Sequence, residues 1–343
     1  MNQTLGKRRR PRPLWLVAAA LAATPLTFLG FAARASTPKA EIERSLLALA
    51  RNRRIRETGL SRVTVPMTCG GETRDVEVTY LRAGTKVPGH RTIVLVHGTP
   101  GSLTTWGKVI FGGEGLRGLA QDHDVVAIEV IGHGFSRSSW APYSFQRCAD
   151  FVAAAVRGLG LRDVCLVGQS YGGEFVWRAA LDHPDLIGRV VLLDSSGHRR
   201  PEDGWMPEEV EIRRHPLARW GYLLNAPERL RTALVPQFRR AVTDEEVEEF
   251  FLVCDNADDW LAMMQIARDE NGTREADIAR IAQPTLLLWG AGDITYPPDR
   301  CARRFAADIP KSELHVVEGS GHYVQEEQPG DVARRIAEFA DRP

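Results

Sequence analysis

Six short apolar runs recur between residues 92 and 317, and helix-like patterns separate them. The central runs show no alternation of apolar and polar residues, which predicts strands covered on both faces. Strands that alternate with helices predict a largely parallel, doubly wound sheet. The runs span residues 92–96, 125–130, 164–167, 190–193, 285–289 and 313–317.

Two further segments depart from this alternation. Residues 62–67 and 74–81 are β-rich runs on either side of Gly70-Gly71, and they predict a hairpin ahead of the parallel strands. Residues 197–283 contain no run typical of a strand, but they are rich in helical spacings. We therefore expect a helical insertion, or cap, over the sheet at about residues 197–283.

The run at 164–167 leads directly into Gly168-Gln169-Ser170-Tyr171-Gly172, and a helical pattern follows. A strand, a G-x-S-x-G turn and a helix in this order lift the serine hydroxyl above the strand ends. A serine hydroxyl needs a base to remove its proton, and the base needs a carboxylate to orient it. Ser170 is therefore the candidate nucleophile.

Candidates for the base and the acid follow later strands. His322 comes after the last predicted strand, and Asp293 follows the run at 285–289. Asp194 follows the run at 190–193 and is an alternative acid. Open α/β sheets place their sites at the carboxyl ends of strands, so these side chains are expected to lie near Ser170.

The turn after the run at 92–96 is the candidate oxyanion hole. Backbone N–H groups that point at a developing oxyanion stabilise the transition state of acyl transfer. Thr99 and Tyr171 are the expected donors, whereas Pro100 has no N–H to offer. Trp106 lies shortly after this turn and is a candidate substrate-binding residue.

From about Val94 to the C-terminus, the chain resembles the α/β-hydrolase superfamily, in particular its serine hydrolases with a helical cap. The resemblance rests on four ordered places: the His97 turn, the Gly132-His133-Gly134 turn, the elbow at Ser170 and the Asp293/His322 pair. It implies a mostly parallel eight-stranded sheet with helices on both faces and a helical cap. One departure is Glu129, at a position where this group usually has Asp.

The predicted reaction is hydrolysis of a carboxylic ester, lipid-like esters included, through an acyl-enzyme intermediate. Carbon–carbon bond hydrolysis and cofactor-free perhydrolysis use the same triad and are alternatives. A ligand-binding protein that retains the fold without turnover is a third reading, which the complete triad disfavours. A small-molecule substrate is expected, and neither a metal nor an organic cofactor is required by this chemistry.

Residues 1–35 have the order of a targeting segment. A basic cluster precedes the apolar run 14–33, and a small-x-small pattern ends at Ala35. The run also has the length of a membrane-spanning helix. A cleaved signal peptide and an N-terminal membrane anchor are both open. Either predicts a hydrolase domain at 36–343 outside the cytoplasm, in a bacterial cell envelope, with membrane association through residues 14–33 in the second case.

The balanced overall charge argues against nucleic acid as a partner. Lys+Arg and Asp+Glu number 44 each, so no global basic charge is present. The five cysteines form no C-x-x-C pair and have no zinc-type spacing with histidine. Cys148 and Cys165 lie in apolar patterns and are predicted to be buried.

Overall fold

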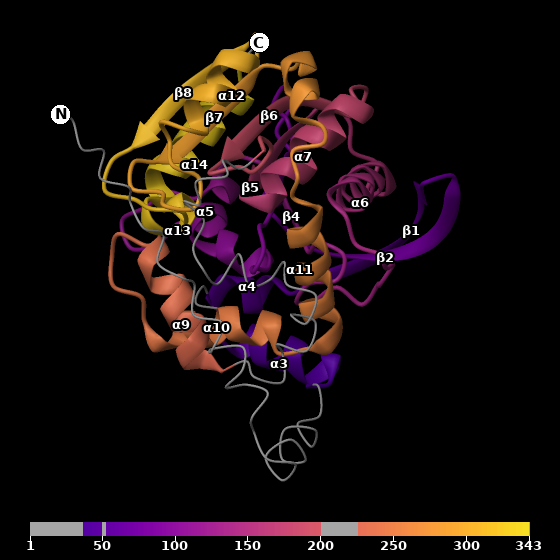
Figure 1. Ribbon diagram of the computed structural model, residues 1–343, viewed down its shortest axis with the longest axis vertical. Coiled ribbons are helices and arrows are strands. Elements are labelled where there is room, and N and C mark those ends of the chain that lie inside the picture. The colour runs from indigo at the N-terminus through magenta and orange to yellow at the C-terminus, as the bar shows by residue number, and fades with distance from the viewer. Residues whose placement is uncertain (1–36, 50–52, 200–225, 343) are drawn as a thin grey trace, which may run out of the picture. The chain divides into compact units, whose positions relative to one another are not determined.

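The computed structural model describes residues 37–49, 53–199 and 226–342. Its strands form one eight-stranded sheet in the order β1-β2-β4-β3-β5-β6-β7-β8 (Figure 1). The β1/β2 and β2/β4 pairs are antiparallel, and the remaining pairs are parallel, which confirms the predicted sheet. The strands are β1 (Ser61–Cys69), β2 (Glu72–Ala83), β3 (Ile93–Val96), β4 (Val125–Ile128), β5 (Val164–Gln169), β6 (Ile187–Leu193), β7 (Thr285–Gly290) and β8 (Ser312–Val317).

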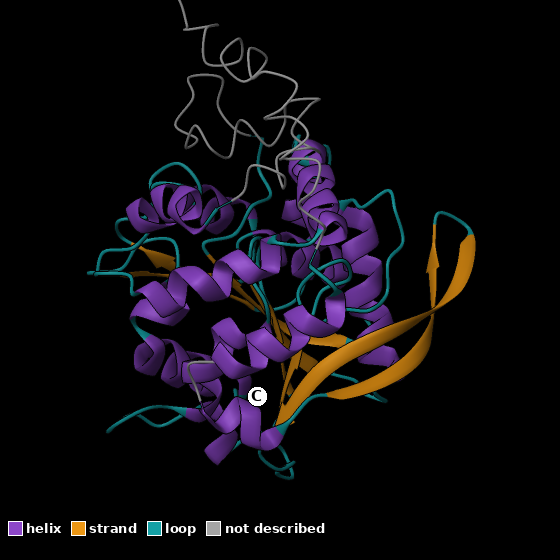
Figure 2. Ribbon diagram, turned by 90° about the horizontal axis from the view of Figure 1, so that it is seen from below, coloured by secondary structure: helices purple, strands orange, loops and turns teal. Residues whose placement is uncertain are grey.

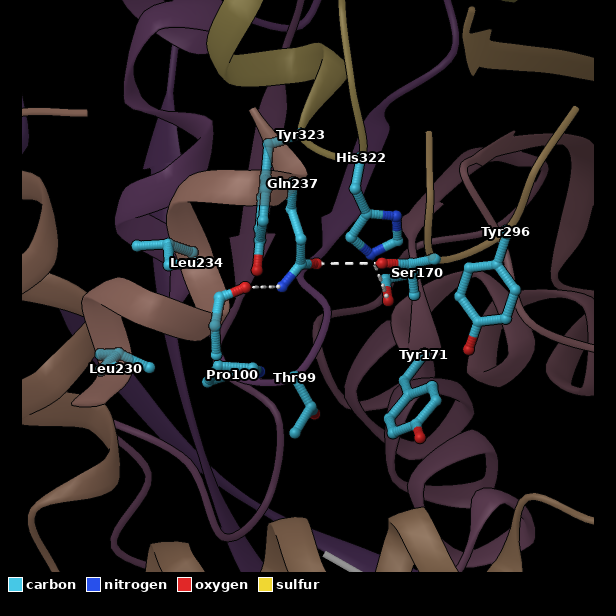
Figure 3. A pocket seen from close by; sticks show the side chains of 12 residues that line it. Thr99, Pro100, Ser170, Tyr171, Leu230, Leu234, Gln237, Tyr296, His322 and Tyr323 are labelled. Atoms are coloured by element: carbon cyan, nitrogen blue, oxygen red, sulfur yellow. Dashed lines mark hydrogen bonds between the residues drawn. The ribbon is translucent and has the colours of Figure 1, made fainter. Parts of the chain in front are cut away.

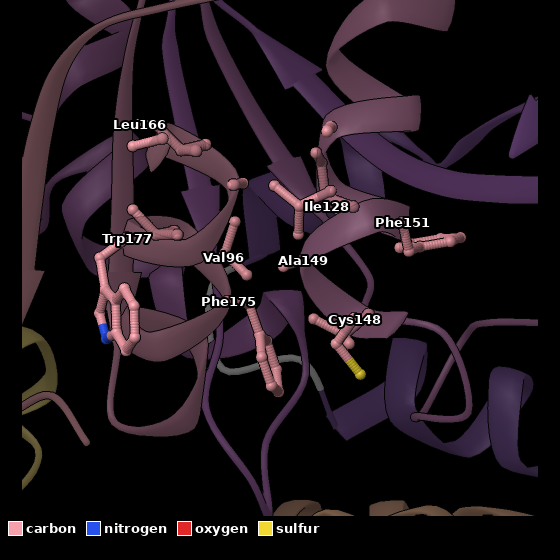
Figure 4. Packing of buried hydrophobic residues seen from close by; sticks show 14 of the residues in the cluster. Val96, Ile128, Cys148, Ala149, Phe151, Leu166, Phe175 and Trp177 are labelled. Carbon is pink, nitrogen blue, oxygen red and sulfur yellow. The ribbon is translucent and has the colours of Figure 1, made fainter. Parts of the chain in front are cut away.

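Both faces of the central strands are covered by helices. In β3, Val94 and Val96 belong to one apolar core, whereas Ile93 and Leu95 belong to a second core on the opposite face. Figure 4 shows the first core, in which Val96 lies near Phe175 of α7. This two-sided burial explains why the central runs do not alternate in the sequence. Cys148 and Cys165 are buried, as predicted.

The helices divide between these two cores. The first core contains side chains of α6 (Phe145–Gly158), α7 (Tyr171–Asp182) and α12 (Ala302–Asp308). The second contains side chains of α3 (Lys39–Leu49), α4 (Arg53–Thr58), α5 (Gly107–Phe111), α13 (Val324–Glu327) and α14 (Pro329–Ala340). The layering of helices around the strands is visible in Figure 2.

The described part of the insertion between β6 and β7 is helical. It contains α9 (Pro227–Leu234), α10 (Asp244–Cys254) and α11 (Ala257–Asp269), with short 3₁₀ turns at Val235–Gln237 and Glu275–Arg280. Leu230 of α9 and Phe250 of α10 form a separate small core with Tyr323, which comes from the chain after β8. Residues 200–225 lie outside the described part, so the cap boundaries at 197 and 283 stay a prediction.

The N-terminal helix α3 is attached to this insertion. Lys39 Nζ lies 2.6 Å from a carboxylate oxygen of Asp259 in α11, and the Thr37 hydroxyl donates to Asp255 at 2.8 Å. The targeting segment 1–35 lies outside the described residues. Among the helices of the described residues, none combines the length and the apolar composition that crossing a membrane requires.

Candidate active site

Ser170 lies in a tight turn between β5 and α7. Its backbone has φ 55° and ψ −124°, a conformation that is uncommon for a residue with a side chain. A β-carbon at Gly168 would lie 2.3 Å from the Gly172 oxygen, and one at Gly172 would lie 2.3 Å from the His97 oxygen. Both glycines are therefore needed for the close backbone approaches that hold this turn.

Replacing Gly172 with alanine tests this constraint. We expect the free energy of unfolding to fall by about 2–4 kcal/mol, because the added methyl group forces two backbone segments apart. Urea unfolding measures the change. Gly113→Ala is the matched control, because its β-carbon would meet no atom closer than 4.0 Å. Equal losses in the two variants would contradict the explanation.

The structure brings Ser170, His322 and Asp293 together in one hydrogen-bonded chain. Ser170 Oγ lies 3.1 Å from His322 Nε2, and His322 Nδ1 lies 3.0 Å from Asp293 Oδ2. All three residues are buried, at 5%, 3% and 3% exposure. A carboxylate only accepts, so Nδ1 carries the proton and Nε2 accepts from the serine hydroxyl. Figure 3 shows the His322 ring directed at Ser170.

Asp293 is held by the loop that follows β7. Its Oδ1 atom accepts hydrogen bonds from the backbone N–H groups of Thr295 at 2.7 Å and Tyr296 at 3.0 Å. The other oxygen, Oδ2, faces His322. The two oxygens therefore have separate tasks, one fixing the side chain and the other orienting the imidazole.

The alternative acid, Asp194, is fully buried after β6. Its Oδ1 accepts from the Gly290 N–H at 2.8 Å, and its Oδ2 makes no hydrogen bond within the described part of the chain. Burial raises the pKa of the Asp194 carboxyl, and the nearby charge of Asp293 raises it further. The carboxylate that is hydrogen-bonded to His322 is that of Asp293.

Gln237 of the insertion holds the segment that carries His322, and it was not identified from the sequence. Its backbone oxygen accepts from the His322 N–H at 2.8 Å, and its side-chain oxygen accepts from the Thr295 hydroxyl at 3.1 Å. Gln169, which precedes Ser170, donates to the His322 oxygen at 2.9 Å. The insertion and the elbow thus both fix the loop that carries His322.

Thr99 and Tyr171, the expected oxyanion donors, line the same cavity as Ser170 (Figure 3). The Thr99 hydroxyl lies 2.8 Å from His133 Nε2, and His133 Nδ1 lies 3.2 Å from the Ile131 oxygen. Because a backbone oxygen only accepts, His133 Nδ1 carries the proton and Nε2 accepts from Thr99. The neutral imidazole of His133 therefore positions the turn at Thr99.

His97 is also a neutral imidazole with its proton on Nδ1. Its Nδ1 donates to the Gly98 oxygen at 2.8 Å, and its Nε2 accepts from the Val130 N–H at 3.0 Å. Burial lowers the pKa of His97 to about 4 and that of His133 to about 3, because the charged form loses its hydration.

These directions predict how the two histidines titrate. Both imidazoles are expected to remain neutral with the proton on Nδ1 at pH 5.5, because that pH lies above each lowered pKa. Long-range ¹H–¹⁵N correlation spectra distinguish the neutral tautomers from the cation. Titration of His97 and His133 near the ordinary histidine value of about 6.5 would contradict the assignment.

Glu129, the departure from the usual Asp, has a structural role. It is fully buried, and its carboxylate accepts from the Leu103 N–H at 2.9 Å and the Phe135 N–H at 3.2 Å. Gly134 accommodates it, because a β-carbon there would lie 2.2 Å from Glu129 Oε1. The carboxylate therefore ties the turn at 132–136 to the segment that follows the oxyanion turn.

The cavity in front of Ser170 is small, about 30 Å³. Its described lining contains neither lysine nor arginine. On one side, the hydroxyls of Tyr171 and Tyr296 each lie 2.8 Å from a different oxygen of the buried Glu270, at the end of α11. The lining residues are Thr99, Pro100, Ser170, Tyr171, Leu230, Ala233, Leu234, Gln237, Thr295, Tyr296, His322 and Tyr323.

Trp106, the sequence candidate for substrate binding, lies elsewhere. Its side chain is fully buried in the second apolar core, together with Val109 and Phe135, and it is not part of the cavity lining. Its sequence position close to the oxyanion turn did not reveal this, because a 3₁₀ turn at Leu103–Trp106 directs the chain back into the core. The cavity wall comes instead from α9 and the two tyrosines.

Comparison with known proteins agrees with this architecture. Residues 91–329 match the family described as the alpha/beta hydrolase fold. An uncharacterised hydrolase of Bacillus subtilis, YugF, is 30% identical over 74% of this chain and 90% of its own length. A 2-hydroxymuconate semialdehyde hydrolase of Pseudomonas sp. is 25% identical over 72% of this chain and 86% of its own. The crystal structure of a bacterial membrane phospholipase A aligns with a TM-score of 0.69, at 23% identity over 95% of this chain and 96% of that one.

Proposed function

The chain belongs to the α/β-hydrolase family, and from this premise we propose that it is a serine hydrolase that cleaves a carboxylic ester through an acyl-enzyme. One observation carries the proposal. Ser170, His322 and Asp293 form a continuous buried chain of hydrogen bonds at the carboxyl ends of β5, β8 and β7. That arrangement supplies a nucleophile, a base and an orienting carboxylate in contact.

In the first step, Ser170 Oγ attacks the ester carbonyl carbon while His322 Nε2 takes the hydroxyl proton. The carbonyl oxygen becomes an oxyanion, which the N–H groups of Thr99 and Tyr171 stabilise. Loss of one such donor costs about 3–4 kcal/mol of transition-state stabilisation in other hydrolases. The negative charge of Asp293 stabilises the imidazolium that forms.

In the second step, the tetrahedral intermediate collapses, and the bond to the alcohol oxygen breaks. His322 Nε2 returns its proton to that oxygen, so an alcohol leaves and the acyl group stays on Ser170. A water molecule then attacks the acyl-enzyme, with His322 again taking the proton. Release of the carboxylic acid restores the hydroxyl of Ser170.

The cavity favours a small, uncharged ester. Its described lining offers no cation to bind an anionic substrate, and the buried Glu270 carboxyl group lies behind two of its walls. The volume of about 30 Å³ is small for a long acyl chain, which would have to displace Leu230 and Leu234 of α9.

Carbon–carbon bond hydrolysis is the second candidate, because one relative is named for the hydrolysis of 2-hydroxymuconate semialdehyde. The substrate in that name carries a carboxylate, which the described cavity does not complement. Turnover of p-nitrophenyl acetate and butyrate at least about tenfold faster than octanoate would support the short-ester proposal. Turnover of a dienoate ring-cleavage product, with none of these esters, would favour the second candidate instead.

We further propose that residues 1–35 direct the hydrolase domain out of the cytoplasm. The basic cluster ahead of the apolar run 14–33 supports export. N-terminal sequencing of the protein from a bacterial host distinguishes the two forms of the proposal. A start at Ser36 indicates a cleaved signal, and a retained Met1 in the membrane fraction indicates an anchor. Recovery of the uncleaved chain in the cytosol would contradict both.

A further inference from the structure

Two histidines and an aspartate from three segments far apart in the sequence meet at the amino-terminal ends of the central strands, opposite the end that carries Ser170. His90 precedes β3, His123 precedes β4, and Asp341 follows α14. Asp341 Oδ1 lies 3.1 Å from His123 Nε2 and 3.4 Å from His90 Nδ1. The cluster lies at the amino-terminal ends of β3 and β4, whereas Ser170, Asp293 and His322 lie at the carboxyl-terminal ends of β5, β7 and β8.

The spacing of these atoms fits the coordination shell of a small metal ion. Zn²⁺ bonds to imidazole nitrogen and carboxylate oxygen are about 2.0–2.2 Å long, so adjacent ligands in a tetrahedron are separated by about 3.3–3.6 Å. The two distances from Asp341 lie close to that range, and all three ligand atoms lie within 4.8 Å of one another. The ring centroids of His90 and His123 are 5.2 Å apart.

The surroundings supply three further requirements of a cation site. The His123 side chain is 4% exposed and therefore fixed, whereas those of His90 and Asp341 are 36% and 33% exposed, so an ion and a water ligand can enter from solvent. His90 Nδ1 is buried and makes no hydrogen bond within the described residues. Asp341 also caps the C-terminus of α14, where the helix dipole favours positive charge.

Arg91 is a competing cation at the C-terminal end of α14. Its Nη1 donates to the backbone oxygens of Ala340 at 3.1 Å and Arg342 at 3.0 Å, and its Nε pairs with Asp163. The contacts of Arg91 are thus with backbone oxygens and with Asp163, whereas the Asp341 carboxylate lies against the two imidazoles. The donor set of two nitrogens and one carboxylate suits Zn²⁺ and its neighbours in the transition series, and it does not suit Mg²⁺ or Ca²⁺.

We propose that His90, His123 and Asp341 bind one divalent transition-metal ion of the zinc class, with water as a further ligand. The ion joins the C-terminal end of α14 to the segments that enter β3 and β4. It takes no part in ester hydrolysis. Because it binds the folded chain, it stabilises that state by mass action.

The test uses the untagged protein, since a polyhistidine tag would itself bind metal. After removal of metal with EDTA, ZnCl₂ is titrated in a calorimeter, with MgCl₂ as the comparison. We expect one Zn²⁺ per chain, no heat from Mg²⁺, and a rise in the midpoint of thermal unfolding of about 2–4 °C with saturating Zn²⁺.

Two variants of partly exposed ligands locate the site without threatening the core. His90→Ala and Asp341→Asn are each expected to weaken Zn²⁺ binding by at least about tenfold. His183→Ala, a histidine outside the cluster, is the matched control and should bind as the wild type does. His322→Ala should also retain binding, which separates this site from the triad.

Two outcomes would overturn the proposal: a wild-type chain that binds no Zn²⁺ in the micromolar range, or unchanged binding by both His90→Ala and Asp341→Asn. Neither outcome depends on esterase activity, so the metal site and the proposed reaction are tested independently.

Discussion

Replacing Ser170 with alanine is expected to lower kcat for p-nitrophenyl butyrate by about 10⁵–10⁶-fold, with little change in stability. The hydroxyl is the only group that is lost, and its hydrogen bond is to His322 at 3.1 Å. The remaining rate comes from substrate binding and the oxyanion donors, which the substitution leaves in place. Alanine takes the same backbone conformation at about the same cost as serine, so the turn should persist.

Two measurements check this expectation. Steady-state kinetics gives kcat, and labelling with a fluorophosphonate reports an activated serine directly. Ser195→Ala is the matched control, because Ser195 is a buried serine shortly after β6 whose hydroxyl donates to the backbone oxygen of Ser196. It should keep its label and stay within about tenfold of the wild-type rate. A Ser170→Ala protein that still labels would remove Ser170 from its assigned role.

The sheet could be predicted because its residues obey a rule of burial. Strands covered on both faces are continuous apolar runs, and β3, β4, β5 and β7 are of this kind. The start of β6 was harder to place. The strand begins at Ile187, but the apolar run in the sequence begins only at Val190. Arg189, inside the strand, is buried and stacks on Phe339 at 5.1 Å. Because Arg189 is charged, it interrupts the apolar pattern, and its burial against Phe339 cannot be seen in the sequence.

The meeting of Ser170, Asp293 and His322 could be predicted because parallel strands bring their carboxyl ends together, whatever their separation along the chain. Gln237 and Glu270 could not. They reach the site from the insertion, and their partners are set by how that insertion packs on the sheet. The same holds for His90 and His123, whose meeting with Asp341 depends on tertiary packing rather than on ligand spacing.

Asp293→Asn is expected to lower kcat by about 10³–10⁴-fold while the protein stays folded. The reason is the orientation of the new amide. Thr295 and Tyr296 donate to Oδ1 of Asp293, so the asparagine oxygen should remain with these donors. Its NH₂ group then faces His322 Nδ1 and favours the tautomer with the proton on Nε2. An imidazole protonated at Nε2 cannot accept the proton of Ser170.

Asp194→Asn separates the two candidate acids, because the same substitution should have a small effect there. Asparagine has the shape of the aspartate, and because burial and the charge of Asp293 raise the pKa of Asp194, an uncharged amide should be tolerated at this position. The Gly290 N–H keeps an acceptor in the amide oxygen. We expect kcat to change by less than about tenfold. Kinetics of both variants at one pH, with circular dichroism to confirm folding, gives the ranking. The opposite ranking would assign the acid to Asp194, because only the carboxylate that faces Nδ1 can hold the imidazole in the tautomer that accepts the serine proton.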